Sequence, residues 1–265
     1  MSVAVVGSLS LDFVDGGAPR VGGAPFYAAR ALRALGAPAV IAAKCAAPDR
    51  HLLLPPLIRL GLPVRWQDSS ASAAFSFSYE REQRRMSIEA IADPWTPAEA
   101  VEAVGDARWV QVAPLSRADF PAETLAALAR GRRLLLDGQG LARPARIGPL
   151  VLDADYDPAV LRSVSVLKLS ADEAELLVDG YDERALGRLG VREVVVTLGS
   201  RGCIVFADGV AELVRAHPVA AADPTGAGDA FAAAYVVARS GGAAPTAAAR
   251  RAAALVSDLL AGRAA

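Results

Sequence analysis

Apolar runs that alternate with helical patterns are the feature of this chain that most constrains its fold. Several short runs, bounded by Gly, Pro or Asp, have the length and composition of buried strands: 3–7, 38–43, 108–112, 132–137, 164–169 and 192–199. Segments with helical periodicity lie at 25–35, 51–60, 121–129, 172–178, 228–239 and 245–261. Strands that alternate with helices predict an α/β fold with three layers, α/β/α, around a central, mostly parallel sheet.

Residues 75–91 depart from this alternation. Phe75 and Phe77 alternate with serines, a charged turn follows, and Met86 and Ile88 alternate again with polar residues. A period of two predicts a β-hairpin with one apolar face, which we interpret as a small lid. A chain of 265 residues is long enough for one large core. We therefore expect a single domain, 1–265, with a reduced lid from about 12–23 and 75–91.

Charge and cysteine usage argue against several classes of protein. A formal net charge of −1 disfavours general binding to nucleic acid or to an acidic membrane, which needs many Lys and Arg side chains. The N-terminal segment lacks the features of a signal peptide and no run reaches the length of a membrane span, so we expect a cytoplasmic protein. Cys45 and Cys203 are predicted to be buried thiols, and His51 and His217 are too isolated for a zinc site or a Ser-His-Asp triad.

The segment ADPTGAGDAFAAAY, 222–235, carries the clearest chemical signal. It predicts a loop that opens onto a helix N-terminus, where unpaired amides and the helix dipole favour an anion. Gly226, Ala227 and Gly228 leave those amides open to a phosphate, and Asp229 would lie at the same end as a general base. From spacing alone, a plain helix cap explains the motif equally well. The spacing fits neither a dinucleotide fingerprint nor a Walker-type P-loop.

DPTGAGDAF closely resembles the C-terminal signature of the ribokinase-like (PfkB) family of carbohydrate and nucleoside kinases. GGAPFYAARALRALG (22–36) is similar to the family's N-terminal signature. LKLSADEAELL (167–177) resembles its Asn-x-x-Glu segment, and VVVTLGSRGCIVF (194–206) resembles the strand-loop-strand before its nucleotide site. The resemblance implies a ribokinase-like fold and an enzyme that uses ATP and Mg²⁺.

The resemblance also implies roles for the residues that match the signatures. Asp229 would be the catalytic base, and Gly226, Ala227 and Gly228 would form its anion hole. The residues that contact the acceptor would be Asp12, Gly22, Gly23 and Tyr27. Of these, Gly22 and Gly23 would form the hinge between lid and core. On the donor side, ATP would be bound by Thr197, Gly199, Gly202 and Ser170. Mg²⁺ would be held by Glu173, largely through water, and a monovalent cation such as K⁺ by Asp223 and Thr225.

Departures from the family pattern bear on some of these roles. Tyr27 replaces the usual Asn of the first signature, which suggests an acceptor other than ribose. Ser170 replaces the Asn of Asn-x-x-Glu, and with Glu173 it also forms a capping box, as Thr96 does with Glu99. Helix initiation therefore explains the Ser170–Glu173 pair as well as catalysis does. Because the chain stops soon after its last helical segment, the completeness of the cation site stays open.

LLLDGQGLARP (134–144) resembles a run found in a short branch of the family that includes myo-inositol kinase-like proteins, and Tyr27 fits that branch. Gln139 and Arg143 either face the phosphates or belong to a simple turn after a strand. We predict an ATP-dependent kinase that phosphorylates a hydroxyl of a small polyol or sugar, with an inositol-like acceptor as one candidate.

Two alternatives stay open. A nucleoside kinase of the same fold would need an aromatic stacking surface, for which Phe26, Tyr27, Phe75 and Phe77 are candidates. A non-catalytic, sugar-sensing relative would bind its ligand without turnover, although the intact GAGD argues against it. The apolar face of the hairpin is compatible with a homodimer that shares lids, or with packing on its own core.

Overall fold

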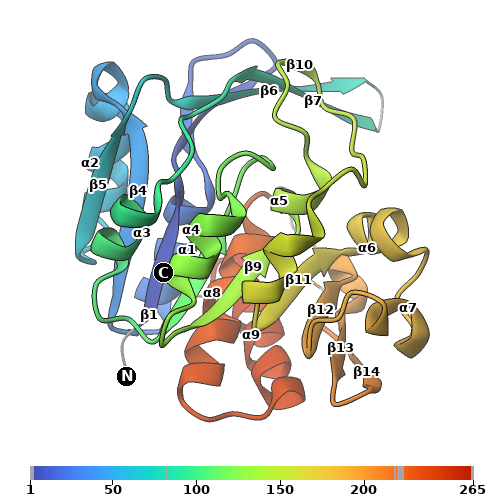
Figure 1. The fold of residues 1–265 in the computed structure, drawn as a ribbon. Coiled ribbons are helices and arrows are strands. Elements are labelled where there is room, and N and C mark those ends of the chain that lie inside the picture. Colours follow the sequence, from blue (N-terminus) through green and yellow to red (C-terminus); the bar gives the residue numbers. More distant parts are fainter. Residues whose placement is uncertain (1–2, 81–82, 218, 220–223, 264–265) are drawn as a thin grey trace.

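The predicted apolar runs form neighbouring strands of one sheet (Figure 1). The computed structural model describes residues 3–80, 83–217, 219 and 224–263. Within these residues the core sheet has nine strands in the order β14-β13-β12-β11-β9-β8-β1-β4-β5. Their bounds, in that order, are Val210–Val214, Cys203–Ala207, Glu193–Thr197, Val166–Ser170, Arg133–Asp137, Trp109–Ala113, Val3–Ser8, Ala39–Ala46 and Val64–Ser69. Neighbouring strands from β12 to β5 are parallel, whereas β13 pairs antiparallel with both β12 and β14. The predicted α/β class is confirmed.

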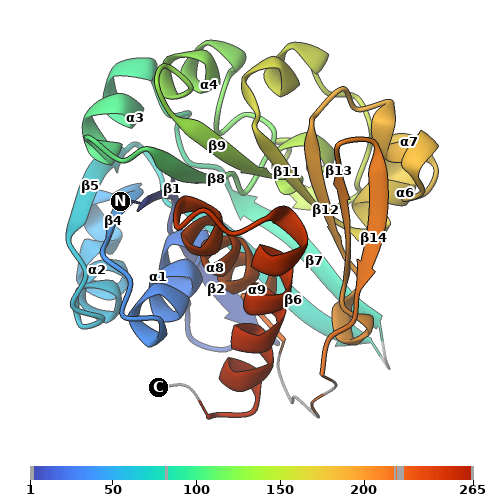
Figure 2. The ribbon, with the colours of Figure 1, turned by 90° about the horizontal axis from the view of Figure 1, so that it is seen from below.

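Helices cover both faces of the core sheet because side chains alternate along each strand. Val3 and Val5 of β1 pack into one apolar cluster, and Ala4 and Val6 pack into the other. The first cluster lies against α1, α2, α8 and α9, which span Ala24–Ala34, Arg50–Ile58, Ala227–Ser240 and Pro245–Leu260. The second lies against α3, α4, α6 and α7, which span Pro97–Val104, Ala122–Leu128, Ala171–Val178 and Glu183–Gly187. Figure 2 shows the two helical layers on either side of the sheet.

Shorter elements complete the connections between strands and helices. A single turn of helix, α5 (Gln139–Ala142), follows β9. Short 3₁₀ segments lie before α2 (Ala47–Asp49), before β11 (Pro158–Ser163) and after β12 (Gly199–Arg201).

Both predicted capping boxes are present. At the start of α3, Glu99 N donates to Thr96 Oγ1 at 3.3 Å and Thr96 N donates to Glu99 Oε2 at 2.9 Å. At the start of α6, Glu173 N donates to Ser170 Oγ at 3.2 Å and Ser170 N donates to Glu173 Oε2 at 2.8 Å. These exchanges satisfy amide donors that helix starts leave unpaired. Ser170 therefore has a structural role as the cap between β11 and α6.

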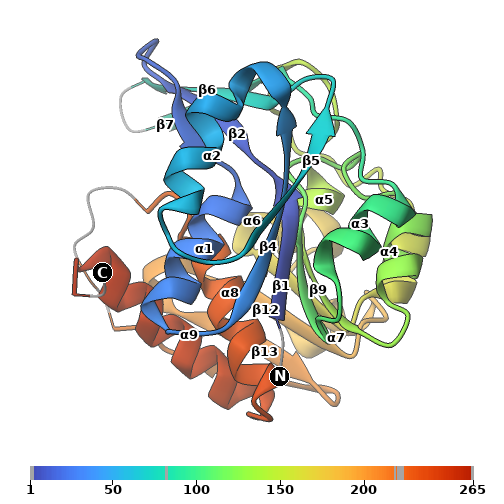
Figure 3. The same cartoon turned by 90° about the vertical axis from the view of Figure 1, so that its left-hand side faces the viewer.

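The predicted hairpin belongs to a larger lid sheet. Its strands, β6 (Ala73–Glu80) and β7 (Gln83–Ala90), pair antiparallel. In the part of the chain that the structure describes, this sheet has five strands in the order β10-β7-β6-β2-β3. The remaining three are Gly148–Pro149 (β10), Ser10–Val14 (β2) and Arg20–Gly22 (β3). Figure 3 shows the lid sheet at the top of the molecule. The segment predicted as a reduced lid at 12–23 thus contributes two short strands, and β10 was not predicted because two residues have no periodicity.

The apolar face of the lid packs within the chain. Phe75, Phe77 and Ile88 are buried in a small cluster with Ala92 and Leu115. Of the two explanations for the apolar hairpin face, the structure of the single chain therefore supports packing on its own residues.

Two other expectations concern the cysteines and the membrane. Cys45 and Cys203 are free and fully buried, as predicted. Among the described residues, none of the helices combines the length and apolarity that crossing a membrane requires.

Candidate active site

The predicted site residues gather where the parallel strands end. β1 continues into the lid through Ser10 and Asp12, while β9, β11 and β12 end at Asp137, Ser170 and Thr197. In the core sheet β4 and β5 lie on one side of β1, and β8, β9, β11, β12, β13 and β14 lie on the other. In open α/β sheets such a switch point, at the carboxyl ends of the strands, is where ligands bind. The topology therefore places a pocket between this edge and the lid.

A pocket of about 200 Å³ lies at this edge, and both apolar and polar side chains line it. The apolar ones include Phe75, Phe77 and Met86 of the lid and Leu115 after β8. Polar side chains from several elements line the rest: Ser10, Asp12, Tyr27, Gln139, Arg143, Thr225 and Asp229. We call this cavity the acceptor pocket.

Asp12 lies on β2, at the lid end of the acceptor pocket. Ser10 Oγ donates to Asp12 Oδ1 at 2.7 Å, and the Asp12 side chain is largely buried. The backbone of Gly22 in β3 lies so close that a Cβ there would come within 2.1 Å of Asp12 Oδ2. Only glycine allows β3 to approach this carboxylate. Gly23, with a φ of 90°, lines the pocket beside it.

Asp229 lies in the first turn of α8, under the acceptor pocket. Burial and the negative charge of Asp137 raise the pKa of Asp229 to about 7. Lys168 and Arg143 act in the opposite direction, and Asp12 adds to the increase. A carboxylate that titrates near neutral pH is suited to act as a general base.

The glycine-rich loop before Asp229 packs tightly on both sides. Gly226 caps α8 in the left-handed region, with a φ of 78°. A Cβ on Gly226 would lie 2.2 Å from the Tyr27 ring, and one on Gly228 would lie 3.2 Å from Lys168 Nζ. The small residues are therefore required by packing as well as by access to the pocket.

The structure also narrows the predicted anion hole. Ala227 N already donates to Pro224 O at 3.0 Å, which closes the turn before α8. The Ala227 amide is therefore already hydrogen-bonded within the protein. Gly228 lines the acceptor pocket and a second pocket on the other side of the loop. Gly228 is therefore the residue of the predicted anion hole that borders both pockets.

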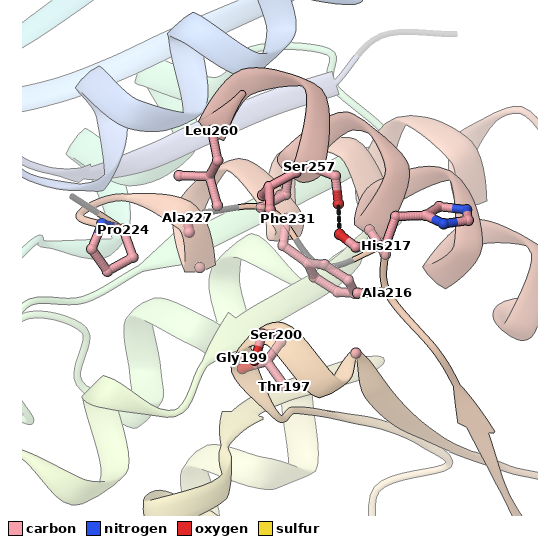
Figure 4. Close-up of a pocket in the computed structure, with 15 residues that line it drawn as sticks. Thr197, Gly199, Ser200, Ala216, His217, Pro224, Ala227, Phe231, Ser257 and Leu260 are labelled. Atoms are coloured by element: carbon pink, nitrogen blue, oxygen red, sulfur yellow. Dashed lines mark hydrogen bonds between the residues drawn. The ribbon is translucent and has the colours of Figure 1, made fainter. Parts of the chain in front are cut away.

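The second pocket, of about 300 Å³, lies between the loop after β12 and helices α8 and α9 (Figure 4). We call it the donor pocket. Thr197, Gly199 and Gly202, which are among the residues predicted to contact ATP, line this pocket. The side formed by α8 and α9 is mainly apolar, with contributions from Ala227, Phe231, Val256 and Leu260. Gly202, with a φ of 105°, must be glycine because a Cβ would lie 2.0 Å from Val214 O.

A cluster of buried charges lies behind the glycine-rich loop. Lys168 Nζ donates to Asp137 Oδ2 at 2.7 Å, and both side chains are almost completely buried. Burial and the charge of Asp137 raise the pKa of Glu173, while Lys168 opposes this increase. Burial lowers the pKa of Lys168, but the surrounding carboxylates outweigh it and raise that pKa overall.

A model of the pfkB family of carbohydrate kinases matches residues 19–257. The chain belongs to this family. The resemblance inferred from the four sequence segments is therefore confirmed, and the site described above lies at the sheet edge of a pfkB-family protein.

Similar proteins act on polyols and sugars. The chain is 30% identical to an inositol 3-kinase of Oryza sativa subsp. japonica over 208 residues, which cover 73% of the chain and 47% of that protein. The chain thus spans about half the length of this relative. A pyrophosphate-dependent kinase of the ribokinase family, solved with a pyrophosphate analog and myo-inositol, is 25% identical with a TM-score of 0.84, covering 98% of this chain and 95% of its own. Arabidopsis thaliana ribokinase, solved with ribose and ATP, shares the fold at 20% identity and a TM-score of 0.71, covering 98% and 92%.

Several residues of this pfkB-family site were not predicted from the sequence. Lys168 and Asp137 carried no assigned role, although a charged residue within the apolar run 164–169 is a signal that buried strands seldom show. Gln111 of β8 donates through Nε2 to Asp229 O at 3.3 Å, and nothing in the sequence indicated it. Arg143 does line the acceptor pocket. Its backbone carbonyl accepts from Arg117 N at 2.8 Å, which fixes the segment after α5.

The predicted metal residues have different positions. Glu173 Oε2 accepts a hydrogen bond from Ser170 N. Within the described ranges no group of three or more His, Cys, Asp or Glu side chains is arranged to hold a metal. Mg²⁺ commonly keeps several waters and takes only one or two carboxylates plus substrate phosphates. Glu173 would fit that mode of binding, in which waters and substrate phosphates supply most of the ligands. Thr225 lines the acceptor pocket, and Asp223 lies outside the described residues.

Proposed function

We propose that this chain transfers a phosphoryl group from ATP to a hydroxyl of a small polyol or sugar, with an inositol-like acceptor as the first candidate. One observation carries the proposal. Asp229, a carboxylate that titrates near pH 7, lines the acceptor pocket one residue after Gly228, which lines both pockets. An acceptor hydroxyl and a donor phosphate can therefore meet at Asp229.

In the proposed reaction Asp229 accepts the proton of the acceptor hydroxyl. The hydroxyl oxygen forms a bond to the terminal phosphorus of the donor, and the bond from that phosphorus to the leaving oxygen breaks. The Gly228 amide, at the positive end of α8, stabilises the negative charge that develops. Glu173 would hold Mg²⁺ largely through its waters, and the ion would supply positive charge to the donor phosphates.

The size and lining of the acceptor pocket support a small polyol. Its volume of about 200 Å³ is below the ~300 Å³ at which ligand sites for drug-sized molecules begin. Among the lining residues, Asp12, Gln139 and Arg143 provide polar groups for the hydroxyls of the acceptor, and Phe75 and Phe77 provide an apolar surface for its ring. The rice inositol 3-kinase and the structure with myo-inositol support the same acceptor class.

The donor pocket supports a nucleotide. Its apolar side suits a base, and none of the described residues that line it is Lys or Arg. A donor composed only of phosphates would need such cations to balance its charge. Pyrophosphate is nevertheless the second candidate, because the similar kinase solved with myo-inositol is pyrophosphate-dependent.

The test is a matrix of acceptors and donors. The protein is incubated with Mg²⁺, with ATP or pyrophosphate, and with myo-inositol, ribose or inosine, and phosphoesters are detected by ³¹P NMR. We expect product from ATP and a small polyol. Product formed with pyrophosphate and not with ATP would show that pyrophosphate is the donor. Product formed from inosine alone would identify a nucleoside kinase.

Asp229→Asn tests the catalytic base. It should lower turnover by about 10²–10⁴-fold, the usual contribution of a general base. Asp258→Asn, which removes a half-exposed carboxylate paired with Arg263, is the control and should keep wild-type turnover. Wild-type turnover in Asp229→Asn would refute the assignment of the base. Calorimetric binding of a sugar with no turnover from any donor would instead support a sensing protein.

A further inference from the structure

Lys168 is one of only two lysines in the chain, and it lies behind the reaction centre. It is 4% exposed, near the end of β11, and its ammonium is held by Asp137, which is 1% exposed. An ammonium has three N–H donors. Within the described residues, Lys168 Nζ donates to Asp137 alone, at 2.7 Å. The side chain is therefore fixed in place with donors to spare.

Lys168, which lines neither of the two pockets, also lies against Gly228 in the first turn of α8. A Cβ on Gly228 would lie 3.2 Å from Lys168 Nζ and 3.5 Å from Cε. The same Gly228 lines the acceptor and donor pockets. The thickness of one glycine thus separates the ammonium from the place where the phosphoryl group would transfer.

Negative charge dominates around this ammonium. Asp229 of α8 faces Asp137 of β9, Asp12 of β2, Lys168 of β11 and Arg143 after α5. Glu173 of α6 faces Lys168 and Asp137 as well. Lys168 is the buried cation in this group, since Arg143 opens into the acceptor pocket.

We propose that Lys168, held by Asp137, is a positioning residue for phosphoryl transfer that fixes the first turn of α8 and balances the carboxylate of Asp229 from behind Gly228. The proposal rests on the proposed function, because it concerns the same reaction centre. It assigns the Asp137–Lys168 pair a role in turnover, beyond that of a buried ion pair that holds β9 to β11.

The proposal predicts effects of opposite sign for the two partners. Lys168 lowers the pKa of Asp229 and Asp137 raises it. The base is active when ionised, so turnover should rise with pH through about 7 in the wild type. Lys168→Met should move this midpoint to higher pH, and Asp137→Asn should move it to lower pH. A pair that only supports the fold would shift neither midpoint.

The experiment measures kcat and KM against pH for the full chain and for Lys168→Met, Lys168→Arg and Asp137→Asn. Lys44→Met, which removes the other buried lysine, is the matched control. We expect Lys168→Met to lower kcat about tenfold or more at neutral pH, with KM changed by less than about threefold. Lys168→Arg should restore most of kcat because it keeps the charge. Lys44→Met should leave the kcat of the folded protein near the wild-type value.

A titration of the Asp229 carboxyl by ¹³C NMR, assigned with Asp229→Asn, gives a readout that does not depend on activity. If the wild type phosphorylates no acceptor, the proposed function fails while this titration still decides the role of Lys168. An unchanged midpoint in Asp137→Asn would overturn the proposal even if Lys168→Met does not fold. Equal loss of kcat in Lys44→Met and Lys168→Met would overturn it too.

Discussion

The two lysines of this chain occupy similar positions in the core sheet and have different surroundings. Lys44 lies in β4 and Lys168 in β11, both close to the carboxyl ends of parallel strands and both buried. Lys44 Nζ donates to Glu99 Oε2 at 3.0 Å and to Pro94 O at 2.9 Å, and lies 4.9 Å from the centre of the Trp95 ring. Among the described residues, Lys168 Nζ donates to Asp137 alone, and the carboxylates of Glu173 and Asp229 act on it only through their charge.

Local balance of charge is what distinguishes the two regions. Around Lys44 one carboxylate, one carbonyl and one aromatic face match one cation. Burial alone would raise the pKa of Glu99, but hydrogen bonds from Thr96 and Lys44 outweigh it and lower that pKa. Around Lys168 the carboxylates exceed the cations, and the pKa values of Glu173 and Asp229 are raised. Such imbalance opposes stability and is typical of functional sites.

The largest expected effect is on stability when each lysine is replaced by Met. Lys168→Met leaves buried carboxylates without their cation and should lower the free energy of unfolding at pH 8 by about 3–5 kcal/mol. Lys44→Met leaves Glu99, whose side chain is 32% exposed and still capped by Thr96, so we expect about 1–2 kcal/mol. Urea unfolding of both variants measures the difference. Equal losses would remove the distinction between the two regions.

A second effect, of opposite sign, concerns Asp229. Its pKa rises from 3.8 in the unfolded chain to about 7 in the folded protein, so the folded state binds the extra proton between these values. The free energy of unfolding therefore falls as pH rises through this window, by up to about 4 kcal/mol. Asp229→Asn removes that loss and should stabilise the protein at pH 8, with little effect near pH 4.

Urea unfolding at both pH values checks the prediction for Asp229. Asp258→Asn provides the control, because its carboxylate is half-exposed beside Arg263. A destabilised Asp229→Asn at pH 8 would show that the ionised carboxylate is well satisfied, and the contrast with the Lys44 region would then be wrong.

The smallest effect is expected from a single methyl group. Gly228→Ala places a Cβ against Lys168 Nζ, which must shift by a few tenths of an ångström, so it should cost about 1 kcal/mol and lower turnover. Gly187→Ala, at the exposed end of α7, places its Cβ 3.9 Å from Phe206 and should change the free energy of unfolding by less than about 0.5 kcal/mol. Thermal unfolding and kcat of both variants test this, and unchanged turnover in Gly228→Ala would contradict close contact between Lys168 and the reaction centre.

Local patterns in the sequence were sufficient for much of the fold. The period of two in 75–91 predicted β6 and β7, and the boxes at Thr96 and Ser170 predicted the starts of α3 and α6 within one residue. These signals depend on neighbouring residues along the chain. The two-residue strand β10 and the short strands β2 and β3 depend on partners elsewhere, so the full lid sheet could not be predicted.

The same division applies to the candidate site. The sequence by itself determined the family, the helix that carries Asp229 and the glycines before it, because the motif is contiguous and its backbone requirements are local. The tertiary structure alone decided that Lys168 meets Asp137, 31 residues away, behind Gly228. Parallel strands bring distant residues together at one edge of a sheet, and burial there turns their separate charges into one coupled group.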